Sequence, residues 1–160
     1  MTPGLSVRGG LLAALLLAAV ACGGTAVTPP PVSPSPSVAP LVKTATATVA
    51  GTSKTILVGA TTGMTLYYFT PDKGGKTTCT GGCLANWPPL LLPAGQTKVI
   101  ATSDIPGKFT TLTNAEASGQ QVLYQNWPLY FWVKDKQPGD ATGEGVGGKW
   151  FVATPGLAAG

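Results

Sequence analysis

The chain has 160 residues, of which 10% are charged, and its formal net charge at neutral pH is +4. The few basic residues form no run, so the sequence argues against a nucleic-acid-binding surface. Histidine is absent, which excludes Ser-His-Asp and Cys-His catalysis, histidine-bound zinc and haem with a proximal histidine.

The first 21 residues have the features of an export signal. Arg8 supplies a positive charge ahead of the apolar segment 11–20, which is too short for a membrane-spanning helix. Small residues then lead to Cys22, as in the lipobox of bacterial lipoproteins, where the cysteine is lipidated and becomes the new N-terminus. We therefore expect residues 1–21 to be a lipoprotein signal peptide, with Cys22 anchored in the bacterial cell membrane on its extracytoplasmic side. The alternative is ordinary cleavage after Ala21, which would release a soluble secreted protein with a free thiol.

Residues 22–40 are predicted to be the lipidated cysteine followed by a tether. Prolines alternate there with Ser, Thr, Val and Ala, a composition that cannot bury a core and favours extended polyproline II. The folded domain is expected at residues 41–157.

Within that domain the patterns are those of short strands. Thr44–Val49 alternates threonine with small apolar residues, as an edge strand does. Two hairpins are predicted, one joining 55–58 to 65–69 and one joining 109–113 to 121–124. A final strand is expected at 150–152, and a short turn near 83–86 is the one helix that we expect. The sequence therefore predicts an all-β fold.

One aromatic pattern occurs twice and organises the domain. In each copy a Tyr is followed by a large aromatic residue and an Asp, then by Lys, a glycine-containing loop and a Trp at the same distance. We expect each of these stretches to be a strand, and because both of its faces are apolar, each strand should be covered on both sides. Each copy alone is too small to bury much surface. We therefore expect two tandem antiparallel β repeats, at about 55–90 and 118–155, that share one core with pseudo-twofold symmetry. The motif residues, expected to be structural, are Tyr67, Phe69, Asp72 and Trp87 in the first copy and Tyr130, Trp132, Asp135 and Trp150 in the second.

These twin stretches resemble the bacterial secreted-repeat lipoproteins that are defined by a Tyr-x-(Phe/Trp/Tyr)-x-x-Asp motif. The resemblance extends to the Cys79–Cys83 and Trp87–Pro89 segments and covers roughly residues 56–155. It implies an exported protein of this architecture. Because no activity is assigned to that family, it supplies no catalytic residue.

The motif carboxylates, Asp72 and Asp135, have two interpretations. A facing pair across a cleft could perform acid/base hydrolysis. Each Asp also ends a strand and precedes a glycine-containing loop, where its side chain can accept hydrogen bonds from backbone N–H groups two residues on. We favour the second, structural interpretation.

Cys79 and Cys83 leave three alternatives open. With Cys22 lipidated, they form an even pair in an oxidising compartment, which favours a disulfide. A reduced pair could instead be redox-active, or could bind Cu(I) together with Met64, since thiolate and thioether ligands select that ion.

The loop 143–148 fits Gly-x-Gly-x-x-Gly, but we predict no nucleotide there. That motif needs a strand before it and a helix after it. Here a turn precedes the loop and the strand-like segment 150–152 follows it.

Taken together, these features predict a non-enzymatic module of the cell envelope without a cofactor. Its expected partners are the membrane, through Cys22, and an envelope protein or a glycan. The alternative is a redox or Cu(I)-handling lipoprotein that works through Cys79 and Cys83.

Overall fold

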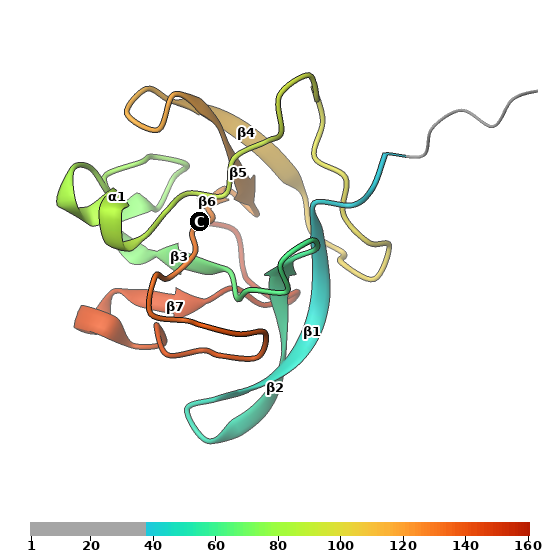
Figure 1. The fold of residues 1–160 in the computed structure, drawn as a ribbon, viewed down its shortest axis with the longest axis vertical. Coiled ribbons are helices and arrows are strands. Elements are labelled where there is room, and N and C mark those ends of the chain that lie inside the picture. The colour runs from blue at the N-terminus through green and yellow to red at the C-terminus, as the bar shows by residue number, and fades with distance from the viewer. Residues whose placement is uncertain (1–37) are drawn as a thin grey trace, which may run out of the picture. The chain divides into compact units, whose positions relative to one another are not determined.

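The computed structural model describes residues 38–160, so the expected signal peptide, Cys22 and most of the expected tether lie outside the described residues. Strands and loops predominate in the described part, which confirms the all-β class, and none of its helices has the length and apolar character needed to cross a bilayer (Figure 1). The strands are β1 (Val42–Val49), β2 (Thr52–Gly59), β3 (Tyr67–Phe69), β4 (Phe109–Asn114), β5 (Gly119–Tyr124), β6 (Trp127–Pro128) and β7 (Trp150–Val152). The helical turns are η1 (Thr70–Asp72), α1 (Gly82–Asn86) and η2 (Val146–Gly148).

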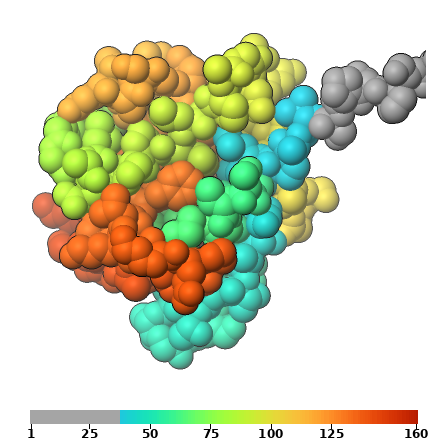
Figure 2. All heavy atoms as spheres, in the orientation of Figure 1, coloured from blue at the N-terminus to red at the C-terminus, as the bar shows by residue number. Residues whose placement is uncertain are grey.

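Strands β1 and β2 form a long hairpin that projects from the rest of the domain (Figures 1 and 2). Its two-residue turn places Ala50 and Gly51 at positive φ, as the tight turns that match the strand twist require. The predicted hairpin from 55–58 to 65–69 is present in short form. Val58 bridges Thr65, the Gly59 N–H donates to the Met64 carbonyl, and the Leu66 N–H donates to the Leu57 carbonyl, both at 2.9 Å. Segment 55–58 belongs to β2, whose main partner is β1, with which it pairs along its whole length.

The second hairpin confirms the sequence prediction. Strand β4 pairs with β5 from Phe109 opposite Tyr124 to Asn114 opposite Gly119. On its other edge, β5 pairs with β6. The predicted short helix near 83–86 is also present, as α1.

The two motif stretches meet at the centre of the domain. Tyr67 and Tyr130 form an antiparallel bridge in which each backbone N–H donates to the carbonyl of the other, at 2.8 and 2.9 Å. Each stretch then pairs with the Trp-containing segment of the other repeat: β3 pairs with β7, and Tyr130 pairs with Pro89. The two repeats are thus interlocked through exchanged strands.

The second motif stretch is not the regular strand that the sequence predicted. It pairs with the Trp87–Pro89 segment, where two consecutive residues are prolines without a backbone N–H. The ladder there is reduced to the Tyr130–Pro89 bridge and scattered bonds, such as Phe131 N–H to the Pro88 carbonyl at 2.8 Å. Its counterpart β7 has Phe151 and Val152 at the corresponding positions and forms a regular strand.

The core consists of two clusters of buried residues, and each contains residues of both repeats. One cluster is aromatic and includes the motif Tyr and Trp side chains, against which the Ala and Val side chains of β1 pack. The other is largely aliphatic and includes Leu57 and Leu66 from the first repeat and Val122 and Leu129 from the second. Neither repeat encloses a core of its own.

Candidate functional site

The motif tyrosines and aspartates form two reciprocal hydrogen bonds between the repeats. The Tyr67 hydroxyl donates to Oδ2 of Asp135 at 2.7 Å. The Tyr130 hydroxyl donates to Oδ2 of Asp72 at 2.6 Å. All four residues are buried. The two motifs therefore recognise each other, and neither carboxylate serves its own repeat's tyrosine.

The second oxygen of each carboxylate closes the loop that follows it. Oδ1 of Asp72 accepts bonds from the backbone N–H and the hydroxyl of Thr78, at 2.7 and 2.6 Å. Oδ1 of Asp135 accepts the same two bonds from Thr142, at 3.0 and 2.7 Å. The expected bonds two residues on are replaced by bonds six and seven residues on. Sequence reasoning missed both threonines, although a Thr at a similar distance after each Asp was visible in the repeat.

Burial raises the pKa of both motif tyrosines above the ordinary value, and their hydrogen bonds to the carboxylates raise it further. Each phenol also accepts a weaker bond: the Gly143 N–H lies 3.2 Å from the Tyr67 oxygen, and Thr77 Oγ1 lies 3.3 Å from the Tyr130 oxygen. The phenols therefore stay protonated at neutral pH and act as fixed donors.

The large aromatic residues of the two motifs stack in one column. The order is Phe69, Trp150, Trp87, Trp132, with ring centroids 4.2, 3.8 and 4.0 Å apart, so that rings of the two repeats alternate. The central pair, Trp87 and Trp150, is parallel to within 2°. Tyr67 and Tyr130 meet this pair edge-on at 5.4 and 5.2 Å. The motif Tyr and Trp side chains are therefore core residues, as the two-faced strands predicted, and the half-buried Phe69 packs against them.

Cys79 and Cys83 form a disulfide, which confirms the favoured interpretation of that pair. Their Cα atoms lie 5.3 Å apart across the turn that leads into α1. Cys79 is buried in the aromatic cluster and Cys83 packs against it. Met64, the third ligand of the copper alternative, is not a member of this cluster. Residues 38–160 contain no group of three or more His, Cys, Asp or Glu side chains placed to hold a metal ion.

The glycine loop 143–148 contributes to the core. A Cβ atom at Gly143 would lie 2.7 Å from a ring carbon of Tyr67 and 2.8 Å from one of Trp87. Only glycine leaves room for these rings. Gly145 adopts a left-handed conformation, and strand β7 begins directly after the loop. The loop thus packs on the motif tyrosine and has none of the strand-loop-helix geometry of a phosphate site.

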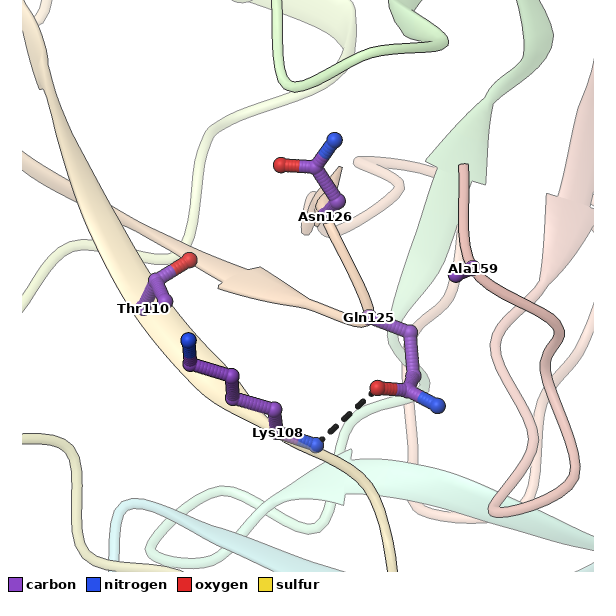
Figure 3. Close-up of a pocket in the computed structure, with 5 residues that line it drawn as sticks. All are labelled: Lys108, Thr110, Gln125, Asn126 and Ala159. Carbon is purple, nitrogen blue, oxygen red and sulfur yellow. Dashed lines mark hydrogen bonds between the residues drawn. The ribbon is translucent and has the colours of Figure 1, made fainter.

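Four hollows of about 200–290 Å³ in the surface of residues 38–160 have no motif residue in their linings. One of about 270 Å³ is lined by Lys108, Thr110, Gln125, Asn126 and Ala159. Figure 3 shows one bond between two lining residues, from the Lys108 backbone N–H to Oε1 of Gln125 at 3.1 Å. This lining has one charged group and no carboxylate, so it offers no acid/base pair.

The fold and the interlocked motifs define an all-β protein of two tandem repeats, in which the repeated motif joins one copy to the other. The family model described as a secreted repeat of unknown function, Lipoprotein_15, matches residues 47–91 and 113–154. The chain therefore belongs to this family. No curated protein and no solved structure matches it.

Proposed function

We propose that this chain is a lipid-anchored, non-catalytic binding or structural module at the bacterial cell envelope. The non-catalytic part of the proposal rests on the burial and the hydrogen bonding of the motif carboxylates. Asp72 and Asp135 are buried, and each is bonded to a tyrosine of the other repeat and to a threonine of its own. A carboxylate that is enclosed and bonded on both oxygens is a poor acid or base for a substrate. The motif is therefore assigned to joining the repeats.

The anchoring part of the proposal depends on the sequence before the described residues and on the family. The family is described as secreted, and an apolar segment followed by small residues leads to Cys22. Acyl chains contribute about 0.8 kcal/mol per buried CH₂, so a multiply acylated cysteine holds a membrane stably. An extended tether of about 3.1 Å per residue would then place the β domain on the order of 50 Å from the bilayer. At that reach the partner is an envelope protein or a glycan.

The test of the anchor uses the full-length chain in an exporting bacterial host. Mass spectrometry of the mature N-terminus should find an acylated Cys22, and the protein should fractionate with membranes. The variant Cys22→Ser should not be acylated and should leave the membrane fraction. An unmodified Cys22 on a secreted, soluble chain would contradict the anchor while leaving the β domain's role open.

The redox or Cu(I)-handling alternative requires the two thiols to be reduced, whereas Cys79 and Cys83 are joined. Its test is thiol counting and copper uptake on the mature protein, with and without a reductant. Two thiols that appear only after reduction, with no Cu(I) uptake that depends on Cys79 and Cys83, would retain the non-catalytic proposal. If the protein bound Cu(I) stoichiometrically and the double variant Cys79→Ser/Cys83→Ser did not, the Cu(I)-handling alternative would replace the non-catalytic proposal.

A further inference from the structure

The outer edge of β1 has no backbone partner among the described residues beyond its first few positions. The Leu41 carbonyl accepts the Ala60 N–H at 2.9 Å on the β2 side, whereas the Val42 carbonyl accepts the Thr102 N–H at 3.1 Å on the opposite side. Backbone groups alternate in direction along an antiparallel strand. The N–H and C=O groups of Thr44, Thr46 and Thr48 therefore point away from β2.

No other described residue forms a backbone bond with these three threonines. The Thr44 hydroxyl donates to the carboxylate of Asp104, which belongs to the segment 100–104 that covers the start of β1 (the covering segment). Thr46 and Thr48 are exposed, and this half of the hairpin protrudes from the domain (Figure 2). An open row of donors and acceptors is a template for another strand.

The composition of this edge leaves it unprotected. Proteins commonly blunt an open edge with lysine, proline or a bulge. Between Lys43 and Lys54 the hairpin contains no charged residue and no proline, and the β1–β2 register runs without a bulge from Val42 to Val49. The edge is also short, so any contact that it makes is small.

We infer that the occupant of this edge is a second copy of the chain, paired antiparallel through β1. The alternation Thr-Ala-Thr-Ala-Thr over residues 44–48 reads the same in both directions. In an antiparallel pair it places Thr opposite Thr and Ala opposite Ala. Cross-strand pairs of β-branched hydroxyl residues are favourable, and no like charges face each other.

The covering segment selects the register of the pair. Because Ala101 already pairs with Val42, the tip of the second hairpin cannot extend that far along the edge. Of the registers that remain, the one that pairs the most threonines sets Thr46 of each copy opposite Thr48 of the other, with the twofold axis at Ala47. Four backbone hydrogen bonds then join two hairpins into one four-stranded sheet. The hydroxyl-bearing face stays in solvent, and the face of Ala47 and Val49 stays on the core of each copy.

Two other pairings fit less well. The outer edge of β4 also has no described partner, but its sequence, Phe-Thr-Thr-Leu-Thr-Asn, is not the same in both directions and would set Phe109 against Thr113. The chain's own residues 25–40 contain six prolines, each without the N–H that pairing needs. A second β1 supplies every donor.

The test is cross-linking of the full-length chain in an exporting host with a short bismaleimide. In the paired arrangement the two Thr48 side chains are diagonal neighbours, about 7–8 Å apart. The variant Thr48→Cys should give a cross-linked doubled chain. The matched variant Thr111→Cys, on the open edge of β4, should not.

A second substitution separates pairing from folding. Thr46→Pro, made in the Thr48→Cys chain, removes an outward N–H without removing a hairpin bond, and proline is tolerated on edges. It should lower the cross-link to the Thr111→Cys level. Thr46→Lys should also lower the cross-link, because the two lysines would be like-charged diagonal neighbours in the pair, and it decides the question if the proline variant does not accumulate. Equal cross-linking at Thr48→Cys and Thr111→Cys, a cross-link that survives both substitutions, or cross-linking to a different envelope protein would each overturn the inference.

Discussion

The hydroxyl of Tyr67 donates to the carboxylate of Asp135, which lies 68 residues away in the other repeat, while the equivalent Tyr130 returns the same bond to Asp72. The family motif thus acts between copies. Each copy supplies one donor and one acceptor, and both bonds lie beside the backbone bridge that joins the two tyrosines.

Replacing the motif tyrosine should therefore destabilise the whole domain. In Tyr67→Phe, Oδ2 of buried Asp135 loses its partner, and a buried charged acceptor without a bond costs about 1–3 kcal/mol or more. Tyr130→Phe should cost a similar amount because it is the equivalent residue. The free energy of unfolding, from denaturant titration, measures both. Asp104→Asn, at an exposed carboxylate, is the matched control and should change stability little. If Asp104→Asn lowered the free energy of unfolding as much as the tyrosine variants do, the stabilising role assigned to the Tyr–Asp bonds would be contradicted.

Stability should fall at high pH through the same two phenols. Their pKa is raised by burial in the folded state, whereas an unfolded tyrosine titrates near about 10. Above pH 10 the unfolded chain loses protons that the folded chain retains, so unfolding becomes more favourable as the pH rises. The contribution of the phenols is complete below the unfolded pKa and is lost toward the folded pKa.

Melting temperatures measured between pH 8 and about pH 11 test this dependence, in wild type and in the double variant Tyr67→Phe/Tyr130→Phe. The double variant should begin less stable and show a shallower decline above pH 10, because the two buried phenols with a raised pKa are then absent. If the melting temperatures of wild type and the double variant declined in parallel above pH 10, these two phenols would not be the source of the pH dependence.

The disulfide should contribute modestly. It closes a loop with a sequence separation of 4, for which the loop-entropy relation gives about 2 kcal/mol. The double variant Cys79→Ala/Cys83→Ala should fold and should lose about that amount in denaturant unfolding. The equivalent loop of the second repeat, around Thr142, closes without cysteines. If the double variant failed to fold, the loop of the first repeat would depend on its disulfide, whereas the equivalent loop of the second repeat closes without one.

Gly143 should not tolerate a side chain. Gly143→Ala places its Cβ within 2.8 Å of Tyr67 and Trp87 ring atoms, which must then move within the aromatic cluster. Overpacking of this kind costs typically about 1–3 kcal/mol. Gly82→Ala is the matched control, since a Cβ there meets nothing within 4 Å. Comparison of the two melting temperatures isolates the close contact from the general effect of losing a glycine.

The ring column should be visible in circular dichroism. Trp87 and Trp150 lie 3.8 Å apart, close enough for their transitions to couple strongly. Trp87→Phe should remove the exciton couplet, whereas Trp127→Phe should retain it, because Trp127 packs on Tyr68 outside the column. Trp87→Ala should in addition cost about 3–5 kcal/mol, as is usual for deleting a buried Trp side chain. A couplet that survives Trp87→Phe would contradict the stacked arrangement.

Local patterns in the sequence were sufficient for several features. Alternation and turn residues determined the all-β class and the β4–β5 hairpin, since both depend on neighbours along the chain. The spacing of Cys79 and Cys83 and the expected export favoured the disulfide. The repeated Tyr, Asp and Trp pattern determined the two-copy organisation and the family.

The tertiary structure alone decided how the two copies use that pattern. A repeat is equally compatible with Tyr67 bonding to Asp72 of its own copy or to Asp135 of the other, because the spacing within each copy is the same. The choice follows from the antiparallel bridge between Tyr67 and Tyr130, which turns each side chain toward the opposite loop. The pairing of the second motif with the Trp87–Pro89 segment is reduced to one bridge, and this likewise depends on which segment the motif meets, because only the prolines of that segment break the ladder. Sequence specifies each residue's capacity to bond, and the packing of the two copies against each other selects the partner.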